Sequence, residues 1–266
     1  MRFETETTRA AGDAERIAAQ AGTSHECVVA AGGDGTVHEV ANGLLRAGDG
    51  TRARAALGVL PLGSGDDFHK LLGAGDPIER LARGRIREFD AGRIVADGGT
   101  RHFANGMDIG FGAHGAANVR RVPRFLKGFG AYLGALVLTM VDYPLLRVRL
   151  QLDDEPPRET STAMTAAMNG TTFGGSFRVC PAALPDDGLL DVLEVGPVDR
   201  LGILGLVPKI LQGAHGSDPR VALRTARRLR IEAESPLLVE ADGEIAFEAA
   251  RRLEVEALPR ALKVVS

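Results

Sequence analysis

A strand, a glycine-rich turn and an amphipathic helix follow one another between residues 27 and 45, and this stretch limits the possible folds more than any other. Residues 27–31 are apolar without alternation, which is typical of a parallel strand covered on both faces. Thr36 and Glu39 have the spacing of a capping box, and the apolar residues around them recur at helical intervals. The stretch predicts an α/β unit.

The turn has the composition of a phosphate-binding loop. Gly32, Gly33 and Gly35 let a ligand approach the main chain, and the helix start presents N–H groups to an anion. The loop matches neither the Walker pattern nor the dinucleotide fingerprint. Beside phosphate, Asp34 would hold a magnesium ion, orient a water on that ion or accept a hydrogen bond from a hydroxyl. A tight turn with a solvated aspartate is the alternative.

A second apolar strand followed by a glycine-rich turn is predicted farther along the chain. Residues 55–62 form a compact apolar run, and the sequence Gly63-Ser-Gly-Asp-Asp-Phe68 then opens towards a helix. In an open parallel sheet both turns would lie at the carboxyl ends of their strands, where ligands bind. We therefore expect the two turns to lie side by side, although a plain loop would have a similar composition.

The pattern changes near residue 90. Short strand-like runs with frequent turn residues follow, which predicts a mainly antiparallel, sandwich-like second domain. We expect an α/β domain over residues 1–89, with a short strand at residues 3–7 and a helix at residues 10–21. The β-sandwich domain would span residues 90–266, and its last residues could return to the first domain.

One helix is expected to interrupt the second domain. Apolar residues recur at helical spacing between Phe125 and Met140, and a basic cluster precedes them, made of Arg120, Arg121, Arg124 and Lys127. Two interpretations remain open: a helix packed on the sheet with a solvated basic end, or contact with a lipid chain beside an anionic bilayer surface.

Composition narrows the class of protein. A net charge of −3 with 25% charged residues argues against a general nucleic-acid binder. The two cysteines lie in apolar runs, which favours a reducing compartment without a disulfide framework. The N-terminus has no apolar signal region, and no apolar run reaches about 18 residues. We expect a cytoplasmic protein.

Two later turns also carry acids. Asp186-Asp187-Gly188 precedes a strand-like run, and Asp242-Gly-Glu244 separates two others. Each could be an ordinary connector or hairpin turn.

Together, the four turns resemble motifs of the diacylglycerol kinase catalytic-domain family, especially the soluble bacterial lipid kinases related to sphingosine kinases. The matching segments are residues 32–44, 60–68, 174–188 and 242–244. The resemblance implies an N-terminal domain like that of phosphofructokinase and NAD kinase, with a parallel sheet, and a C-terminal β-sandwich with ATP in the cleft between them. It also implies transfer of the γ-phosphoryl group to a lipid hydroxyl, with diacylglycerol as the leading substrate.

The resemblance assigns roles by position. The nucleotide would be lined by Gly32, Gly33, Gly35, Thr36, Gly63 and Ser64. Asp34 and Asp67 would belong to a network of acids, water and magnesium, with Asp90 as a further member. A structural magnesium site would comprise Asp187, Asp186 and the main chain of Leu189. Asp242 and Glu244 would lie at the catalytic base position, where a carboxylate takes the proton of the lipid hydroxyl.

The resemblance further implies transient contact with the inner membrane surface, and it leaves a homodimer open. Two departures stand out. The chain begins after the strand and Asn-Pro-x-x-Gly loop that open the family's domain, and Asp66 replaces the usual Asn of the second motif. An added carboxylate near phosphate is expected to increase the dependence on metal. Two rival interpretations are an NAD kinase, which shares the Gly-Gly-Asp-Gly turn, and a catalytically silent relative that binds lipid or nucleotide.

Overall fold

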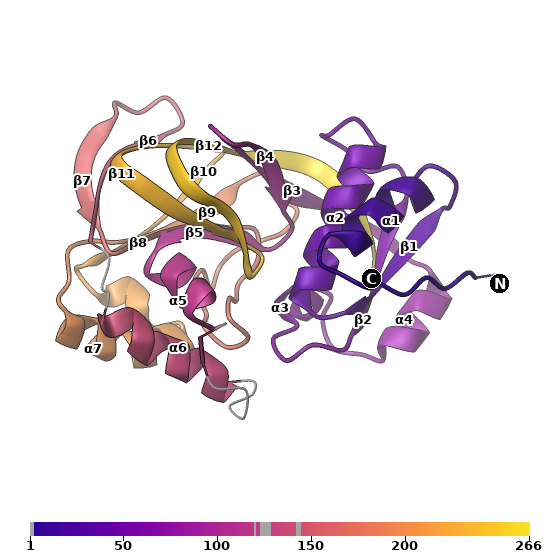
Figure 1. The fold of residues 1–266 in the computed structure, drawn as a ribbon, viewed down its shortest axis with the longest axis horizontal. Coiled ribbons are helices and arrows are strands. Elements are labelled where there is room, and N and C mark those ends of the chain that lie inside the picture. The colour runs from indigo at the N-terminus through magenta and orange to yellow at the C-terminus, as the bar shows by residue number, and fades with distance from the viewer. Residues whose placement is uncertain (1–2, 120, 123–128, 142–144) are drawn as a thin grey trace.

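The computed structural model describes residues 3–119, 121–122, 129–141 and 145–266 and has two domains (Figure 1). The first domain, drawn at the right, contains in chain order α1 (Asp13–Ala21), β1 (Cys27–Gly32), α2 (Asp34–Ala47), β2 (Ala56–Pro61), α3 (Asp67–Lys70) and α4 (Pro77–Arg83). Both described chain ends lie in this domain. The predicted division at residue 89 falls within β3 (Ile86–Ala96), a strand with residues in two hydrophobic cores.

The second domain is a β-sandwich with helices on one side. Its further elements are β4 (Gly99–Phe103), β5 (Gly106–Gly110), α5 (Phe111–Val119), α6 (Phe129–Val141), β6 (Leu146–Leu152), β7 (Arg158–Thr162), β8 (Met164–Met168), β9 (Leu190–Val195), α7 (Arg200–Gln212), η1 (His215–Ser217), β10 (Val221–Ala226), β11 (Arg228–Ala241) and β12 (Glu244–Val265). Figure 1 shows α5, α6 and α7 gathered below the strands.

The strands form one mixed sheet in the order β1-β2-β12-β11-β5-β8-β9-β10, with β3, β4, β6 and β7 paired off this path. The pairings of β1 with β2 and of β2 with β12 are parallel, whereas β3 runs antiparallel to β12. The parallel pairing expected for the first domain is present between β1, β2 and β12, and the sheet as a whole is mixed. Chain segments from the second domain join that sheet and bring antiparallel pairing with them.

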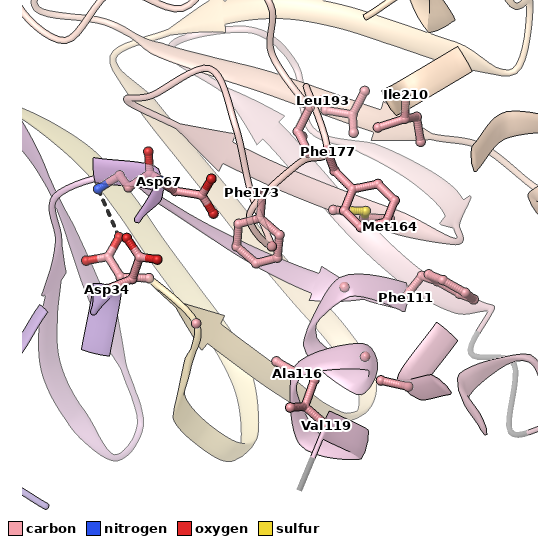
Figure 2. Close-up of a pocket in the computed structure, with 18 of the residues that line it drawn as sticks. Asp34, Asp67, Phe111, Ala116, Val119, Met164, Phe173, Phe177, Leu193 and Ile210 are labelled. Atoms are coloured by element: carbon pink, nitrogen blue, oxygen red, sulfur yellow. Dashed lines mark hydrogen bonds between the residues drawn. The ribbon is translucent and has the colours of Figure 1, made fainter. Parts of the chain in front are cut away.

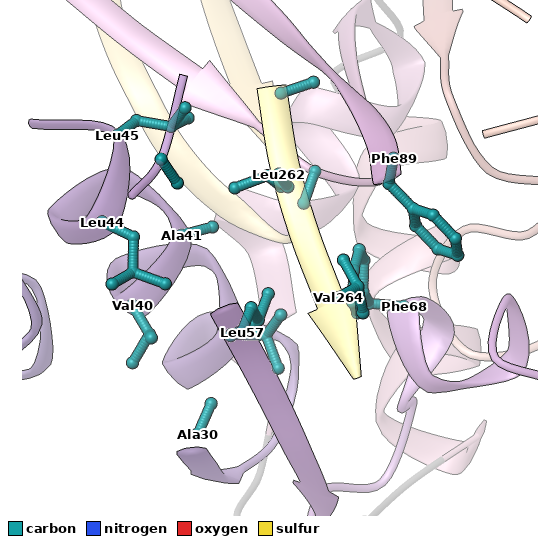
Figure 3. Packing of buried hydrophobic residues seen from close by; sticks show 14 of the residues in the cluster. Ala30, Val40, Ala41, Leu44, Leu45, Leu57, Phe68, Phe89, Leu262 and Val264 are labelled. Carbon is teal, nitrogen blue, oxygen red and sulfur yellow. The ribbon is translucent and has the colours of Figure 1, made fainter. Parts of the chain in front are cut away.

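Strand β12 connects the two domains. The sequence pattern predicted only short strands in this domain, but residues 244–265 form one long strand. A register shift between Leu258 and Leu262 accommodates the turn residues there, with Arg260 at φ +54°. Leu262 and Val264 are fully buried, and Figure 3 shows them near Phe89 and Phe68 in the core of the first domain.

Several local predictions for the first domain are wrong. Residues 3–7 are exposed and form no strand. Glu39 does not cap its own helix, because its carboxylate instead accepts hydrogen bonds from the amides of Gly12 (2.8 Å) and Ala14 (3.0 Å) at the start of α1. Strand β1 is not covered on both faces: Ala30 is buried, but Val29 is 43% exposed.

The second domain has more helices than the one predicted. Helix α6 corresponds to the predicted helix. The predicted residues from Phe125 up to α6, and most of the basic cluster before them, lie outside the described residues. Helices α5 and α7 were not predicted, because α5 is rich in glycine and alanine and α7 contains Pro208. Within the described part of the chain, no helix is long and apolar enough to cross a bilayer.

Candidate active site

The two glycine-rich turns of the first domain touch each other. The amide of Leu62 donates to the carbonyl of Gly32 (3.0 Å), and a Cβ atom on Gly63 would lie 2.5 Å from the Cα atom of Gly33. This confirms that the turns lie side by side, and it explains why both positions are glycine: a side chain on either would collide with the other main chain.

Two segments of the second domain meet these turns. The amide of Gly175 donates to Asp67 Oδ2 (2.7 Å). In the hairpin turn between β11 and β12, Glu244 Oε1 lies 3.0 Å from the position that a Cβ atom on Gly35 would occupy. Segments predicted from four separate parts of the sequence thus come together between the two domains.

A cavity of about 360 Å³ opens where these segments meet. Its polar end contains Asp34, Asp67, Asp242 and Glu244. The rest of its wall is mainly apolar. Val37 and Phe68 contribute to it from the first domain, and most of it comes from the second domain, including Phe111, Ala116, Val119, Met164, Phe173, Phe177, Leu193, Leu206 and Ile210. Figure 2 shows Asp34 and Asp67 together at one side, with Phe173, Phe177 and Ile210 extending away from them. Such a shape suits an amphipathic ligand.

Asp34 has an unfavourable electrostatic environment. Burial, together with the negative charge of Asp67, raises the pKa of its carboxyl to about 6. The amide of Phe68 donates to Oδ1 (3.2 Å) and offsets only part of this effect. A cation bound between such carboxylates would relieve their repulsion.

Asp67 is held from both domains. Its Oδ1 atom accepts a hydrogen bond from Lys70 Nζ (2.7 Å), and Lys70 also donates to the carbonyl of Gly175. Because Lys70 is occupied in this way, it orients Asp67 rather than pointing freely towards a phosphate. Asp66 adopts φ +50° and closes its own turn by accepting from the amide of Gly63 (3.0 Å).

The two acids of the hairpin turn differ in availability. Asp242 is buried, and its carboxylate accepts hydrogen bonds from the amides of Ala104 (2.9 Å), Asn105 (2.9 Å) and Gly106 (3.0 Å), and contacts His38 Nδ1 (3.0 Å). Glu244 is exposed at the cavity mouth. Of the predicted pair, Asp242 therefore serves to position the turn, and Glu244 has the accessible carboxylate.

The residues predicted to line a nucleotide lie around the two touching turns. Gly32, Gly33, Gly35 and Thr36 surround the start of α2, and the amide of Thr36 bonds back to the carbonyl of Gly33 (3.0 Å). Gly63 and Ser64 are exposed. A helix start beside an exposed loop is a suitable place for a phosphate.

Asp90 departs from its predicted role in the magnesium network. It is fully buried and away from the cavity wall, and its two carboxylate oxygens accept the amides of Gly188 (2.6 Å) and Arg260 (2.7 Å). Because both oxygens are bound to main chain, Asp90 anchors the 185–188 turn against the bulge in β12.

The residues of the other predicted metal site lie in that same turn, away from the cavity wall. Asp186 pairs with Arg87 (3.0 Å), and Asp187 accepts from the amide of Leu189 (3.0 Å). Burial and the charge of Asp187 raise the pKa of Asp191 to about 6. Among the residues that the structure describes, no group of three or more acidic, histidine or cysteine side chains could by itself hold a metal ion.

The apolar wall contributed by α5 and α7 was missed by sequence reasoning. Helix α7 does carry boundary signals: Asp199 caps it by accepting from the amide of Gly202 (2.7 Å), and Gly213 ends it at φ +70°. Helix α5 has no comparable boundary signal in the sequence, because it follows β5 directly at Phe111.

Comparisons with known proteins agree with this arrangement. Residues 1–94 match the model of the diacylglycerol kinase catalytic domain, and residues 105–266 match that of the YegS C-terminal NAD kinase beta sandwich-like domain. The chain is 33% identical over 260 residues to a "probable lipid kinase YegS-like" of Pseudomonas aeruginosa, covering 95% of this chain and 81% of that protein. It is also 33% identical over 272 residues to a protein of the same description from Xanthomonas campestris pv. campestris, covering 99% and 86%.

Two solved structures share the fold. A crystal structure of a diacylglycerol kinase from Bacillus anthracis str. Sterne superposes with a TM-score of 0.69 at 20% identity, covering 97% of this chain and 82% of that one. The crystal structure of yeast NADH kinase complexed with NADH gives a TM-score of 0.51 at 14% identity, covering 90% and 60%.

Proposed function

The chain belongs to the family of YegS-like lipid kinases with a diacylglycerol kinase catalytic domain, and from this premise we propose that it transfers the γ-phosphoryl group of ATP to a lipid hydroxyl. Diacylglycerol is the proposed acceptor. One observation carries the proposal: Asp34, Asp67 and Glu244, which come from three separate turns, line one cavity whose remaining wall is mainly apolar.

Glu244 is the proposed general base. A lipid hydroxyl is a poor nucleophile at neutral pH, so its proton must leave as the new phosphorus–oxygen bond forms. Glu244 has an accessible carboxylate beside Gly35 of the phosphate-binding turn. It would accept this proton, while the buried hydrogen bonds of Asp242 hold the turn in place.

The nucleotide is proposed to lie along the two glycine-rich turns, with its γ-phosphate at the polar end of the cavity. Asp34 would hold a magnesium ion there, together with water and phosphate oxygens, which is the usual coordination of magnesium in kinases. Asp67, whose two oxygens accept hydrogen bonds from Lys70 and Gly175, would contact the ion through water. The bound ion would neutralise phosphate charge during transfer. The raised pKa of Asp34 supports this assignment, because burial and the negative charge of Asp67 disfavour its ionised form even with Lys70 paired to Asp67.

The lipid is proposed to place its hydroxyl near Glu244 and an apolar chain between the β-sandwich and helices α5 and α7. Phe173 and Phe177 lie along this path in Figure 2. Burying an alkyl chain against such a wall contributes about 0.8 kcal/mol per methylene group. We further propose a structural magnesium ion at the turn of Asp187 and Leu189, near Asp191.

Transient contact with the inner membrane surface is proposed for the face of α6 and α7. Large apolar side chains are exposed there: Val137 and Val141 on α6, and Leu201 and Leu204 on α7, with exposed fractions between 51% and 77%. Arg200 ties the two helices together by donating to the carbonyl of Val141 (2.8 Å). Because α7 also lines the cavity, a lipid could pass from the bilayer without crossing open water.

A lipid kinase assay tests the proposal. The purified chain is incubated with magnesium, γ-labelled ATP and mixed micelles that contain diacylglycerol, monoacylglycerol, sphingosine or ceramide, and in parallel with NAD. We expect labelled phosphatidic acid and no labelled NADP. Labelled NADP without lipid product would favour an NAD kinase. Nucleotide or lipid binding without turnover would favour a silent relative.

A further inference from the structure

Two carboxyl groups are buried beside the site and take no part in the chemistry proposed above. Asp108 on β5 and Glu240 on β11 are direct cross-strand partners, and both are fully buried. Three of their four carboxyl oxygens, Asp108 Oδ1 and Oδ2 and Glu240 Oε2, have no hydrogen-bond partner of normal geometry, although the amide of Ala113 at the start of α5 lies near Asp108. Two ionised carboxylates in such a place would be strongly unfavourable.

The pair lies between two parts of the site. The fourth oxygen, Glu240 Oε1, accepts a hydrogen bond from the amide of Gly243, the residue between Asp242 and Glu244. On the other side, a Cβ atom on Gly112 would lie 1.9 Å from Asp108 Oδ2, so this carboxyl packs against the first turn of α5. Gly112 itself lines the cavity. The pair therefore contacts both the turn that carries the proposed base and a helix of the lipid wall.

The surroundings favour a proton over a metal ion at the pair. Burial raises the pKa of Asp108 to about 7, and burial and the charge of Asp108 raise that of Glu240 well above its usual value. Asp242 and Glu244 also face Glu240 and add negative charge. On α5 the titratable side chain is His114, whose Nδ1 atom lies 2.8 Å from the carbonyl of Gly110. The amide of Ala113 at the start of α5 favours the ionised form of Asp108, but burial has the larger effect on its pKa.

We propose that Asp108 and Glu240 are positioning residues that share a proton and hold the amide of Gly243, so that Glu244 stays at the polar end of the cavity. The consequence for catalysis rests on the proposed function, whereas the shared proton does not. When the pair loses its last proton at alkaline pH, repulsion between the two carboxylates should displace the turn and lower the rate. The rate of phosphoryl transfer would then fall at alkaline pH because of the Asp108–Glu240 pair, although the general base Glu244 is the same.

Three variants test the proposal in lipid kinase assays from pH 6 to 9.5. Glu240→Leu removes the acceptor for Gly243, and we expect kcat to fall at least tenfold with the KM for ATP unchanged. Glu240→Gln keeps an acceptor and supplies a donor to Asp108, so kcat at pH 7 should return to within threefold of the parent, with a weaker alkaline loss. Glu194→Leu is the matched control, because Glu194 is also buried in the sheet but pairs with Arg158.

The kinetic outcomes separate positioning from simple stability. If Glu240→Leu lowers only the melting temperature, as we expect for Glu194→Leu, the positioning role is wrong. It is also wrong if Glu240→Gln is as inactive as Glu240→Leu, or if both leave the alkaline loss of activity unchanged. The positioning role is supported if Glu240→Gln restores activity and shifts the alkaline side of the pH–rate profile.

A second measurement does not depend on activity. Carboxyl ¹³C NMR of the full chain labelled on aspartate and glutamate should show a carboxyl still protonated at pH 7, and its signal should disappear in Asp108→Asn or Glu240→Gln. If every carboxyl has ionised by pH 6, the shared proton is refuted. If the parent chain phosphorylates no lipid yet the protonated signal is present, the proposed function fails and the acid pair stands.

Discussion

Asp242 and Glu244 are two positions apart in one turn, yet their hydrogen bonds give them different tasks. Asp242 accepts three main-chain amides and contacts His38, so it has no oxygen to spare for a substrate proton. Glu244 lies exposed at the mouth of the cavity. This difference in accessibility follows from burial and not from chemical type, since both are carboxylic acids.

Replacing Glu244 by Gln should lower kcat by about 10²–10⁴-fold, because general base catalysis contributes about that factor. The KM for ATP should stay near its original value, since Glu244 is assigned to the lipid hydroxyl. Steady-state kinetics with diacylglycerol micelles measure both constants. Glu248→Gln, an exposed position on the same strand, is the control. Equal loss in both variants would contradict the assignment.

Magnesium binding should be coupled to the ionisation of Asp34. Because the pKa of this carboxyl is raised to about 6, it is largely protonated at pH 5 and must release a proton to bind a metal ion. The apparent magnesium affinity in the presence of ATP should therefore rise between pH 5 and 7 and then level off. Calorimetry at several pH values measures this. A flat profile, or one that Asp34→Asn leaves unchanged, would show that Asp34 is not the coupled group.

At the scale of elements, helices α5 and α7 form the wall on which lipid selectivity should depend. Ala116 faces the cavity from α5, while its neighbour Ala117 does not line it. Ala116→Phe should obstruct the apolar part, raising the KM for long-chain diacylglycerol more than that for a short-chain analogue. The KM for ATP should not change. Ala117→Phe is the matched control, and an equal effect of the two substitutions would argue against a chain-binding role for this cavity.

The glycine-rich turns and the helices of the cavity wall differ in how well the sequence predicted them. The turn containing Asp34 and the one containing Asp67 were predicted as neighbours, because each follows a compact apolar strand and glycine permits the close approach now seen between Gly33 and Gly63. Helix α5 was not predicted, since its glycines and alanines carry little periodicity. The cavity wall itself depends on long-range packing, which no local pattern encodes.

The role of Asp90 also depends on long-range contacts that the local sequence does not show. Its position suggested a member of the magnesium network, but only the fold reveals that both of its oxygens bind the amides of Gly188 and Arg260. Glu39 is similar: its spacing predicted a cap for its own helix, and instead it caps α1. In both cases the carboxylate accepts hydrogen bonds from main-chain amides in distant segments, which the local sequence pattern does not show.

At the scale of the whole molecule, β12 makes the two domains structurally dependent. It pairs with β11 of the sandwich and with β2 of the first domain, and its residue Leu262 is fully buried in the first core. Leu262→Ala should lower the free energy of unfolding by about 2–5 kcal/mol. Leu201→Ala, at a side chain that is 77% exposed, should change it by less than about 0.5 kcal/mol.

Chemical denaturation measures these free energies, and hydrogen exchange tests the coupling of the domains. Because β12 crosses both cores, Leu262→Ala should increase exchange in the sandwich as well as in the first domain. Increased exchange in the first domain alone would show that the strand connects two independently stable units.

The most direct test of the site is a crystal structure of the chain with manganese, a non-hydrolysable ATP analogue and a short-chain diacylglycerol. We predict an anomalous manganese peak between Asp34 and the γ-phosphate, an acceptor hydroxyl within hydrogen-bonding reach of Glu244, and an acyl chain between α5 and α7. Manganese bound away from Asp34, or a lipid bound outside the cavity with its hydroxyl remote from Glu244, would contradict the account.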